Sequence, residues 1–490
     1  MLSRAERSNM KLNDLINGFG TIEIHGDREV DITSLAYDSK KVKRGSMFIA
    51  VRGFNIDGNV FISDAIKKGA VAVMTDSAQE MRDTVIVRVP DVRKAMALTA
   101  DRFYGSPQKE VVMTAVTGTN GKTTTAYMIK SIFDTGGMDC GLIGTIQHHV
   151  AGETIFSVNT TPEAVDIHEY LARMVSAQQN ACVMEVSSHA LVLSRVYGIQ
   201  FRAAAFLNLS RDHLDFHGNM DGYLQSKSLL FSDLAGDSTA VINRDDANAD
   251  HIIEVSRGSR IITFGNDKRS DIYPLEVGLD TQKTTVLLAT YAGEIEFSLP
   301  IPGRVNVTNA MAATGIALAC GFPKEVIIQG LESLKPVKGR YEIVNEGQDF
   351  TVIVDYAHTP DALKNILSSA KELTKGRLIS VFGCGGDRDK GKRRLMGEIS
   401  EQIADFTFIT SDNPRTENPL SIISDIMTGI SESYKECPDR KEAITKAFHM
   451  AGRGDTVVIA GKGHEDYQIV GTEKKHFDDV ETAHDILRNL

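Results

Sequence analysis

Residues 111–125 read Val-Val-Met-Thr-Ala-Val-Thr-Gly-Thr-Asn-Gly-Lys-Thr-Thr-Thr, and the organisation of the chain can be worked out from this stretch. It begins as an apolar, β-branched run, continues as a glycine loop with a lysine, and ends on threonines that open a helix. This order places backbone N–H groups, the Lys122 ammonium and the Thr123 hydroxyl around phosphates at a helix N-terminus, with the hydroxyl available to Mg²⁺. The stretch therefore predicts a loop that binds the phosphates of ATP or GTP.

The spacing of this loop is tighter than that of the standard phosphate-binding loop. The standard loop has a glycine six residues before its lysine, where this chain has Val116, and Gly118 stands four residues before Lys122. A plain surface turn would also contain glycine and lysine. The clean strand before the loop and the amphipathic helix after it, with apolar residues within Met128–Phe133, favour nucleotide binding over a plain turn.

Length and composition describe an ordinary globular protein. A chain of 490 residues is too long for one core and suggests about three domains. The net charge of −11 argues against a general binder of nucleic acid or of an anionic membrane. No apolar run reaches the length of a membrane span, and the N-terminus lacks the apolar core of a secretory signal. Five scattered cysteines suit a reducing compartment, so we expect a cytoplasmic protein.

The first predicted domain, residues 1–108, is a small α/β domain. After a polar leader over 1–9, the pattern predicts a short helix over 11–18, a polar turn over 38–45, a strand over 46–51, a loop over 52–58, a helix ending near 68–69 and a strand over 70–74.

The second predicted domain, residues 109–335, has polar groups at the ends of its strands, where chemistry collects in open α/β sheets. One buried-looking strand ends on Glu185, and another polar strand end carries His213, so both side chains could reach the metal of the phosphate loop. The adjacent Ser188 and His189 suggest a nucleophilic triad only weakly, because neighbours on a strand point to opposite faces. Further β-type runs at 260–264, 284–289 and 294–298 predict a peripheral sheet, before a helix that follows Gly303 and a hinge at 334–340.

The third predicted domain, residues 336–490, alternates strands and helices, which predicts a doubly wound, mostly parallel, Rossmann-like sheet. Polar loops follow its strands at 383–394, 411–415 and 461–465. The first of these loops lacks the interleaved aromatics of a nucleic-acid site and the twelfth-position Glu of a calcium loop, so an anion is the better ligand for it.

Several motifs together resemble the Mur ligases, over nearly the whole chain and in order. They are Gly118-Thr-Asn-Gly-Lys-Thr-Thr124, Glu185-Val-Ser-Ser-His189, Asn208-Leu-Ser-Arg-Asp-His-Leu-Asp215, Tyr223-Leu-Gln-Ser-Lys-Ser-Leu-Leu-Phe231, Asp355-Tyr-Ala-His358 and Asp412-Asn-Pro-Arg415. The resemblance implies an N-terminal domain for a UDP-sugar, a central ATPase with a mostly parallel sheet, and a C-terminal domain that brings the incoming amino acid. It also implies a ligase that activates a D-glutamyl γ-carboxylate as an acyl phosphate, which a free amine then attacks.

The resemblance assigns roles to individual residues. Lys122, Glu185, His213 and Lys227 would be catalytic, Thr123 and Glu185 would hold one Mg²⁺, and His213 a second, with a carbamate on Lys227 helping to place it. ATP would contact Gly118, Thr119, Asn120, Gly121, Lys122, Thr123, Thr124, Asn306, Asn309, Arg340 and Asp355. UDP would contact Tyr37, Ser39, Phe54, Asn55 and Ile56, and the muramoyl-dipeptide Asn159, Thr160, Thr161, Ser187 and Arg195. The amino acid would contact Arg388, Asp412, Asn413, Pro414, Arg415, Gly461 and Glu465.

The implied substrates are UDP-MurNAc-L-Ala-D-Glu and an amino acid that carries a further ionised group at the far end of its side chain. Arg415 and Arg388 suit the extra carboxylate of meso-diaminopimelate and Glu465 its ammonium, whereas L-lysine would leave Arg415 with little use. The resemblance leads us to expect glutamine where this chain has Leu193, which weakens one predicted polar contact with the substrate but not the assignment.

Three alternatives stay open: an L-lysine-adding Mur ligase, a folylpolyglutamate synthase, and a nucleotide-switched binding protein without ligase chemistry. The N-terminal domain and the Asp412–Arg415 motif count against the folate enzyme. A binding protein would leave Lys227, His213 and Glu185 without roles. We expect a monomer that binds neither nucleic acid nor membrane, and that closes its domains around the substrates.

Overall fold

The computed structural model describes residues 9–18, 23–53, 56–77, 84–234 and 236–490. The predicted leader, apart from Asn9, and the predicted UDP contacts Phe54 and Asn55 lie outside these residues. The chain divides into two compact units, one of residues 1–116, 137–204 and 232–238, the other of residues 117–136, 205–231 and 239–490. The domain boundaries near 108 and 335 stay a prediction.

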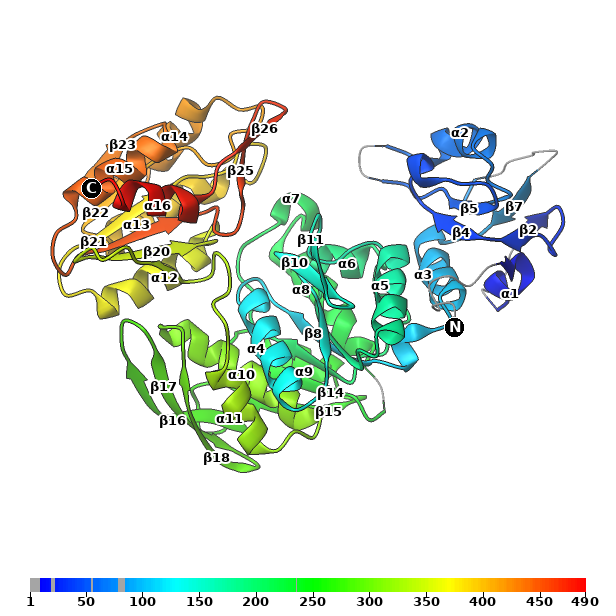
Figure 1. Cartoon of the computed structure of the whole chain (residues 1–490), viewed down its shortest axis with the longest axis horizontal. Helices are drawn as coiled ribbons and strands as arrows, with labels where there is room; N and C mark the ends of the chain where they lie inside the picture. Colours follow the sequence, from blue (N-terminus) through cyan, green and yellow to red (C-terminus); the bar gives the residue numbers. More distant parts are fainter. Residues whose placement is uncertain (1–8, 19–22, 54–55, 78–83, 235) are drawn as a thin grey trace. The chain divides into compact units, whose positions relative to one another are not determined.

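The N-terminal part of the first unit is a five-stranded sheet in the order β2-β7-β6-β5-β4 (Figure 1). Its strands are β2 (Glu23–His25), β4 (Ser34–Ala36), β5 (Ser46–Ile49), β6 (Ala72–Thr75) and β7 (Val85–Arg88), and β4 to β7 are parallel. Helices α1 (Leu12–Ile16) and α3 (Val92–Phe103) pack against one face and α2 (Ile62–Lys67) against the other, while β1 (Met10–Lys11) pairs with β3 (Asp31–Ile32). The predicted small α/β domain is confirmed.

The rest of the first unit is a sheet segment in the order β11-β10-β9-β12-β8. Strands β8 (Val112–Thr117), β9 (Cys140–Ile143) and β12 (Ala181–Glu185) are parallel, and the hairpin of β10 (Gln147–Val150) and β11 (Glu153–Phe156) is antiparallel to them. Helix α5 (Ala164–Ser176) packs against α3, and Ala164 and Val165 join the N-terminal core. Ser188 and His189 lie in the short helix α6 (Ser188–Val192), so their predicted place on a strand is wrong.

The second unit begins at the phosphate loop, which leads into α4 (Lys122–Thr135). Helices α7 (Leu214–His217) and α8 (Met220–Ser232) follow β13 (Ala203–Phe206), and α9 (Ala249–Val255) follows β14 (Thr239–Asn243). Strands β15 (Arg260–Phe264), β17 (Thr284–Thr290) and β18 (Gly293–Leu299) confirm the three predicted runs. They do not form a sheet of their own, because β15 pairs in parallel with β14, and β16 (Ile272–Leu279) joins it to the antiparallel β17 and β18. Helices α10 (Arg304–Ala319) and α11 (Lys324–Glu332) pack on α4.

The C-terminal sheet of this unit has the order β19-β20-β24-β21-β22-β23. Its strands are β19 (Glu342–Val344), β20 (Thr351–Asp355), β21 (Leu378–Phe382), β22 (Phe406–Ile409), β23 (Tyr434–Glu436) and β24 (Thr456–Ala460). All except β19 are parallel. Thr359 caps α12 with a hydroxyl that accepts a hydrogen bond from Ala362 N, and proline follows at the first helical position, which is the expected helix start.

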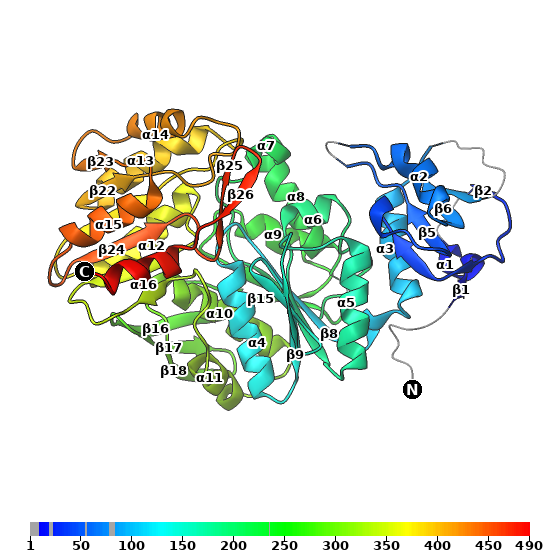
Figure 2. The same ribbon diagram turned by 45° about the horizontal axis from the view of Figure 1, so that its top comes forward.

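Helices cover both faces of this C-terminal sheet (Figure 2). Helices α12 (Pro360–Leu373), α13 (Gly391–Ile403) and α14 (Pro419–Met427) share one apolar core with it, and α15 (Arg440–Met450) and α16 (Asp479–Leu487) share the other. A hairpin of β25 (Tyr467–Val470) and β26 (Glu473–His476) follows the last central strand. The predicted doubly wound sheet is confirmed. Among the helices of the described residues, none is long and apolar enough to cross a bilayer.

Candidate active site

The phosphate loop is shaped by a glycine at the start of α4. Gly121 has a φ of +87°, which favours glycine, and an added Cβ would lie 2.4 Å from Oδ1 of Asn309. Asn309 and Asn306 both lie buried on α10. Asn309 Nδ2 donates to Asn306 Oδ1 at 3.2 Å, and Asn306 Nδ2 donates to Pro302 O at 2.6 Å. The second predicted nucleotide segment therefore packs directly on the first.

The side chain of Asn208 fixes the backbone of the loop. Its Oδ1 accepts hydrogen bonds from Thr119 N at 3.1 Å and Asn120 N at 2.9 Å, and its Nδ2 donates to Asn120 O at 3.1 Å. Thr119 N and Asn120 N, which the sequence predicted to bind phosphates, are therefore hydrogen-bonded to the side-chain amide of Asn208. Asn208 belongs to the segment Asn208–Asp215, in which the sequence pointed to His213 and not to Asn208.

Replacing Asn208 with alanine should raise the KM for ATP about 30-fold. The variant leaves Thr119 N and Asn120 N without their acceptor, and each lost hydrogen bond of this kind is worth about 1 kcal/mol. Steady-state kinetics with varied ATP measure the change, and Asn345→Ala, at an exposed turn of the C-terminal sheet, is the matched control. A KM for ATP that changes equally in both variants would show that Asn208 does not shape the loop.

The cations around the loop are held by specific partners. Lys122 Nζ donates to the carbonyl oxygens of Gly118 and Thr119, both at 2.9 Å. Arg340 Nη2 donates to Thr123 Oγ1 at 3.1 Å, and its guanidinium lies 4.7 Å from the centre of the Tyr356 ring. Asp355, whose pKa is raised by burial, accepts a hydrogen bond from Tyr341 N at 2.8 Å. The structure thus places Arg340 at the hydroxyl predicted to bind Mg²⁺, with Asp355 orienting the backbone next to it.

Lys227 on α8 reaches the loop from the other side. Its side chain is 1% exposed, and Nζ donates to Gly118 O at 2.9 Å and lies 4.6 Å from the centre of the Tyr223 ring. Burial lowers the pKa of Lys227 well below its ordinary value, and the nearby Lys122 lowers it further. A lysine in this setting holds a neutral amine more readily than a surface lysine does.

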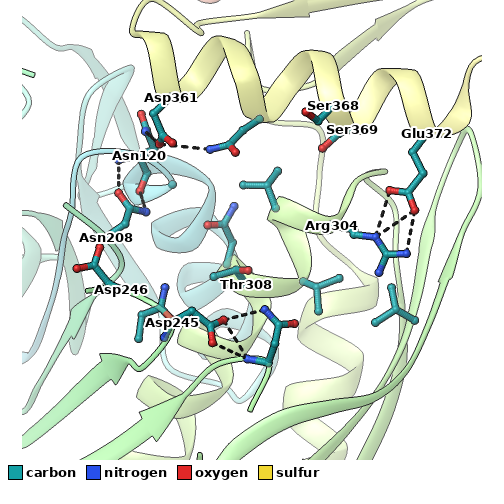
Figure 3. Close-up of a pocket in the computed structure, with 18 residues that line it drawn as sticks. Asn120, Asn208, Asp245, Asp246, Arg304, Thr308, Asp361, Ser368, Ser369 and Glu372 are labelled. Carbon is teal, nitrogen blue, oxygen red and sulfur yellow. Dashed lines mark hydrogen bonds and ion pairs between the residues drawn. The ribbon is translucent and has the colours of Figure 1, made fainter. Parts of the chain in front are cut away.

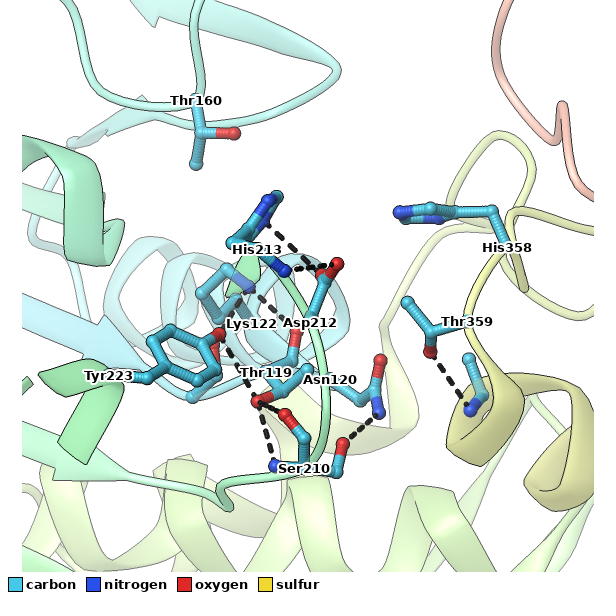
Figure 4. Close-up of polar contacts among 12 residues, drawn as sticks. Thr119, Asn120, Lys122, Thr160, Ser210, Asp212, His213, Tyr223, His358 and Thr359 are labelled. Atoms are coloured by element: carbon cyan, nitrogen blue, oxygen red, sulfur yellow. Dashed lines mark hydrogen bonds and ion pairs between the residues drawn. The ribbon is translucent and has the colours of Figure 1, made fainter. Parts of the chain in front are cut away.

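The segment after β13 brings His213 to the same region (Figure 4). Thr119 Oγ1 lies 3.2 Å from the Tyr223 hydroxyl and accepts a hydrogen bond from Ser210 N at 3.0 Å. His213 has a φ of +53°, and its Nε2 lies 3.2 Å from Asp212 Oδ2. The His213 side chain is 45% exposed, but partial desolvation lowers its pKa, and Asp212 opposes this only in part. A neutral imidazole is the form that can bind a metal.

A polar cavity of about 510 Å³ lies beside the loop (Figure 3). It is lined by Asn120 and Gly121 of the loop, by Asn309 and neighbouring residues of α10, and by residues of α12. At its rim Asp361 Oδ2 accepts hydrogen bonds from Asn120 Nδ2 at 2.7 Å and Ser210 Oγ at 3.2 Å. Asp361 therefore links the C-terminal sheet to the phosphate loop, a contact that the sequence did not indicate.

Glu185 and the predicted dipeptide residues form a connected group in the first unit. The buried Glu185 carboxylate accepts hydrogen bonds from Thr145 N at 2.9 Å and Thr145 Oγ1 at 2.7 Å. Thr160 Oγ1 lies 3.2 Å from Thr145 Oγ1, and Thr161 Oγ1 donates to Glu185 O at 2.8 Å. Ser187 N in turn donates to Thr161 Oγ1 at 3.1 Å. Thr145, which orients the carboxylate, was missed by the sequence reasoning.

Arg195 extends this group. Its Nε donates to Glu163 Oε1 at 3.0 Å and its Nη1 to Thr161 O at 2.8 Å, while Arg93 Nη1 donates to Glu163 Oε2 at 3.2 Å. Asn159 is exposed next to Thr160. Arg93 and Arg195 are thus both paired with Glu163, and Arg195 also holds the backbone at Thr161.

The described UDP residues lie in the N-terminal part of the first unit, outside the strands of its sheet. Tyr37 donates a short hydrogen bond to Asp166 on α5, and burial, followed by Asp166, raises the pKa of the Tyr37 hydroxyl. Ser39 is buried at the start of a short helical turn, and Ile56 is 59% exposed.

The amino-acid residues gather around the loop 412–415 of the C-terminal sheet. Asn413 Nδ2 donates to Glu465 Oε2 at 2.8 Å, and Arg415 Nη1 donates to Gly386 O at 2.8 Å. An added Cβ at Gly461 would lie 2.7 Å from Asp412 Oδ2. Backbone bonds from Arg415 N to Ile469 O and from Gly471 N to Arg415 O tie the loop, with Pro414 inside it, to β25.

Arg388 has different surroundings. It lines a hollow with Leu214, Asp215, Asp387 and Asp389, and Arg415 is not among the lining residues. That Arg388 and Arg415 bind the same carboxylate stays a prediction.

Two other predicted residues lie elsewhere: Thr124 is buried in the first turn of α4, and Leu193 follows the end of α6. Within the described part of the chain, no group of three or more His, Cys, Asp and Glu side chains is placed to hold a metal ion.

Family models match three stretches of the chain. They are described as Mur ligase family, catalytic domain over residues 31–104, Mur ligase middle domain over 116–317, and Mur ligase, glutamate ligase domain over 339–463. The chain belongs to the Mur ligase family.

Individual relatives match nearly the full length. The chain is 42% identical to the UDP-N-acetylmuramoyl-L-alanyl-D-glutamate--2,6-diaminopimelate ligase of Clostridium tetani, over 98% of this chain and 100% of the relative. It is 41% identical to the enzyme of that name from Bacillus licheniformis, over 97% of this chain and 98% of the relative.

Solved structures share the fold. A structure of a ligase with the same name has a TM-score of 0.71 and 32% identity, over 98% of this chain and 99% of that one. A folylpolyglutamate synthase from Mycobacterium tuberculosis has a TM-score of 0.64 and 19% identity, over 76% of this chain and 92% of that one, and shares the fold alone.

Proposed function

We propose that this chain is an ATP-dependent ligase that joins meso-diaminopimelate to the D-Glu γ-carboxylate of UDP-MurNAc-L-Ala-D-Glu, a step in peptidoglycan precursor synthesis. The observation that carries the proposal is the likeness to diaminopimelate ligases over nearly the entire chain, at 42% identity to the one from Clostridium tetani. The phosphate loop and the Asp412–Arg415 loop supply two chemically distinct halves of such a site.

The proposed reaction has two steps. A carboxylate oxygen of D-Glu attacks the γ-phosphorus of ATP, forming an acyl phosphate and ADP. The amine of the amino acid then attacks the carbonyl carbon, the C–N bond forms, the bond to phosphate breaks, and nitrogen loses a proton. The protein's task is to position anions and to neutralise charge.

The residues of the phosphate loop fit that task. Lys122 exchanges the carbonyl oxygens of Gly118 and Thr119 for the β- and γ-phosphates, and Arg340 lies close enough to Thr123 to reach the same phosphates. Gly118 to Thr124 are assigned to the phosphates and Asn306 and Asn309 to the region of the base, while Asp355 approaches the ATP from the C-terminal part of the chain. The cavity beside the loop, which Asn309 lines, supplies polar groups for it.

We keep the Mg²⁺ ligands that the resemblance implies, Thr123, Glu185, His213 and Lys227. Their chemistry fits, since a hydroxyl, a buried carboxylate and a neutral imidazole are all suitable donors. Mg²⁺, when bound, neutralises charge on the phosphoryl oxygens. Lys227 contributes an oxygen only as a carbamate, which forms when its neutral amine adds CO₂ and releases a proton, and its burial favours that amine.

The remaining assignments follow the same resemblance. Tyr37, Ser39 and the segment Phe54–Ile56 are assigned to UDP, and Asn159, Thr160, Thr161, Ser187 and Arg195 to the muramoyl-dipeptide. We assign residues 1–108, 109–335 and 336–490 to the UDP-sugar, ATP and amino-acid domains. The enzyme would act as a monomer in the cytoplasm, with domain closure bringing the amine to the acyl phosphate.

A comparison of amino-acid substrates tests the proposal. With ATP, Mg²⁺ and UDP-MurNAc-L-Ala-D-Glu, meso-diaminopimelate should give a kcat/KM about 100-fold above that of L-lysine, because lysine leaves the Arg415 guanidinium without a carboxylate. Phosphate release and product mass measure both reactions, and a folate with glutamate should give no product. Equal use of the two amino acids, or a preference for lysine, would contradict the assignment.

A further inference from the structure

A buried lysine lies beside the loop assigned to the amino acid. The side chain of Lys462 is 0% exposed, and its Nζ lies 3.3 Å from Glu465 Oε2 and 3.4 Å from Asn413 Oδ1. The same ammonium lies 5.5 Å from the centre of the Tyr467 ring. A charge that is removed from water needs such partners. Lys462 was within a quoted loop, but neither the sequence nor the proposed reaction gives it a role.

Glu465 is the main partner of this lysine. Its Oε2 accepts hydrogen bonds from both Lys462 Nζ and Asn413 Nδ2. Burial raises the pKa of Glu465 and Asp412 raises it further, whereas Lys462 opposes both effects. Lys462 therefore favours the charged form of Glu465 against burial and Asp412, and its hydrogen bond holds the carboxylate in place.

The charges around the loop are balanced. Two buried or half-buried carboxylates, Asp412 and Glu465, are accompanied by two such cations, Lys462 and Arg415, while Asp466 and Lys474 near Tyr467 are exposed to solvent. The neighbouring Arg440 forms a closed pair with Asp479, with 2.7 Å between Arg440 Nη2 and Asp479 Oδ2 and both side chains 0% exposed. Such a pocket matches a ligand end that carries one ammonium and one carboxylate. A lone ammonium would bring one positive charge into a site that is already neutral.

We propose that Lys462 determines which amino acid the pocket selects. By neutralising Glu465 it makes the pocket favour an amino acid whose far end is a zwitterion over one whose far end is an ammonium alone. Lys462 is a positioning residue, because it acts through Glu465 and Asn413. This inference rests on the proposed function. It makes Lys462 a second determinant of amino-acid specificity, besides Arg415.

Three amino acids with different far ends test the inference. Each offers an α-amine for ligation, while the far end is a zwitterion in meso-diaminopimelate, an ammonium in L-lysine and a carboxylate in L-2-aminopimelate. Lys462→Met removes the charge and keeps the length of the side chain. We expect the ratio of kcat/KM for lysine to that for diaminopimelate to rise about tenfold, with the KM for ATP unchanged.

Lys474→Met is the matched control. Lys474 lies on the exposed strand β26, and its Nζ lies 3.6 Å from the centre of the same Tyr467 ring. Its substitution should leave the ratio within about twofold of the native value, because it does not contact Glu465. A tenfold change in this control as well would mean that any positive charge near Tyr467 has the effect, and would overturn the specific role of Lys462.

A second variant decides the matter if Lys462→Met does not fold. Glu465→Gln leaves the positive charge of Lys462 without its carboxylate. The ratio of kcat/KM for 2-aminopimelate to that for diaminopimelate should therefore rise about tenfold, while kcat/KM for lysine falls. Equal losses for all three amino acids in the variants would overturn the role of Lys462. A native enzyme that releases phosphate with none of the three would instead contradict the proposed function.

Discussion

Replacing Lys227 with alanine should lower kcat by about 10³-fold, the range observed when one group that stabilises charge in a transition state is lost. The variant removes the only atom that could carry the carbamate, and it also removes the hydrogen bond from Nζ to Gly118 O. Formate added to Lys227→Ala should restore part of kcat, because it supplies a carboxylate to the space that the side chain leaves. Phosphate release with saturating substrates measures both effects.

Two comparison variants separate the carbamate from the cation. Lys227→Arg keeps a positive charge but cannot add CO₂, so it should be as inactive as Lys227→Ala. Lys371 lies on α12 and forms a surface ion pair with Asp405, so Lys371→Ala should keep native activity. Near-native activity of Lys227→Arg would show that the site needs a cation at this position and would contradict the carbamate.

Replacing Arg415 with alanine should raise the KM for meso-diaminopimelate about 100-fold, because a charge-assisted pair of hydrogen bonds to a carboxylate is lost. Arg415 is held with a φ of +51° and by backbone bonds to β25, so the guanidinium is positioned before the amino acid arrives. The KM for ATP should stay within about twofold of its native value, because the phosphate loop is untouched. Kinetics with each substrate varied in turn measure both constants.

Arg394→Ala is the control for Arg415. Arg394 lies on the exposed face of α13 and pairs with Glu398, with 2.7 Å between Nε and Oε1. Its substitution should change neither constant. A rise in the KM for ATP in Arg415→Ala, without a rise for diaminopimelate, would mean that the loop 412–415 serves the nucleotide.

Local signals were sufficient for most of the elements. The apolar run before the loop is β8 and the amphipathic stretch after it is α4, because both patterns are set by neighbouring residues. In the C-terminal part, the predicted polar loops follow β21, β22 and β24, as the sequence indicated. The alternation of strands and helices was enough to predict the doubly wound sheet.

Other elements depended on contacts that no local pattern carries. The hairpin of β10 and β11 and the strand β16 were not predicted, since their pairing partners decide them. Ser188 and His189 were placed on a strand, although Ser187 accepts a hydrogen bond from Ala190 N and caps a helix there. A serine before an apolar run is a helix-start signal that could have corrected the prediction.

In the candidate site, too, some features are set by the local sequence and others by tertiary contacts. The sequence supplied the residue types at the phosphate loop and at Asp412–Arg415, but not the side chains that orient them. Asn208 fixes the loop from 88 positions away, and Thr145 orients Glu185 from 40 positions away. Such second partners are set by the tertiary fold, and a single sequence carries little trace of them.

The most direct test of the proposed function is a coupled measurement of phosphate and product. The purified protein is incubated with ATP, Mg²⁺ and UDP-MurNAc-L-Ala-D-Glu, with and without meso-diaminopimelate, and phosphate and the mass of the UDP-linked product are followed together. We expect phosphate release that requires both substrates and equals the UDP-tripeptide formed. Phosphate release that is independent of the UDP-dipeptide, or that yields no UDP-tripeptide when both are present, would contradict the account.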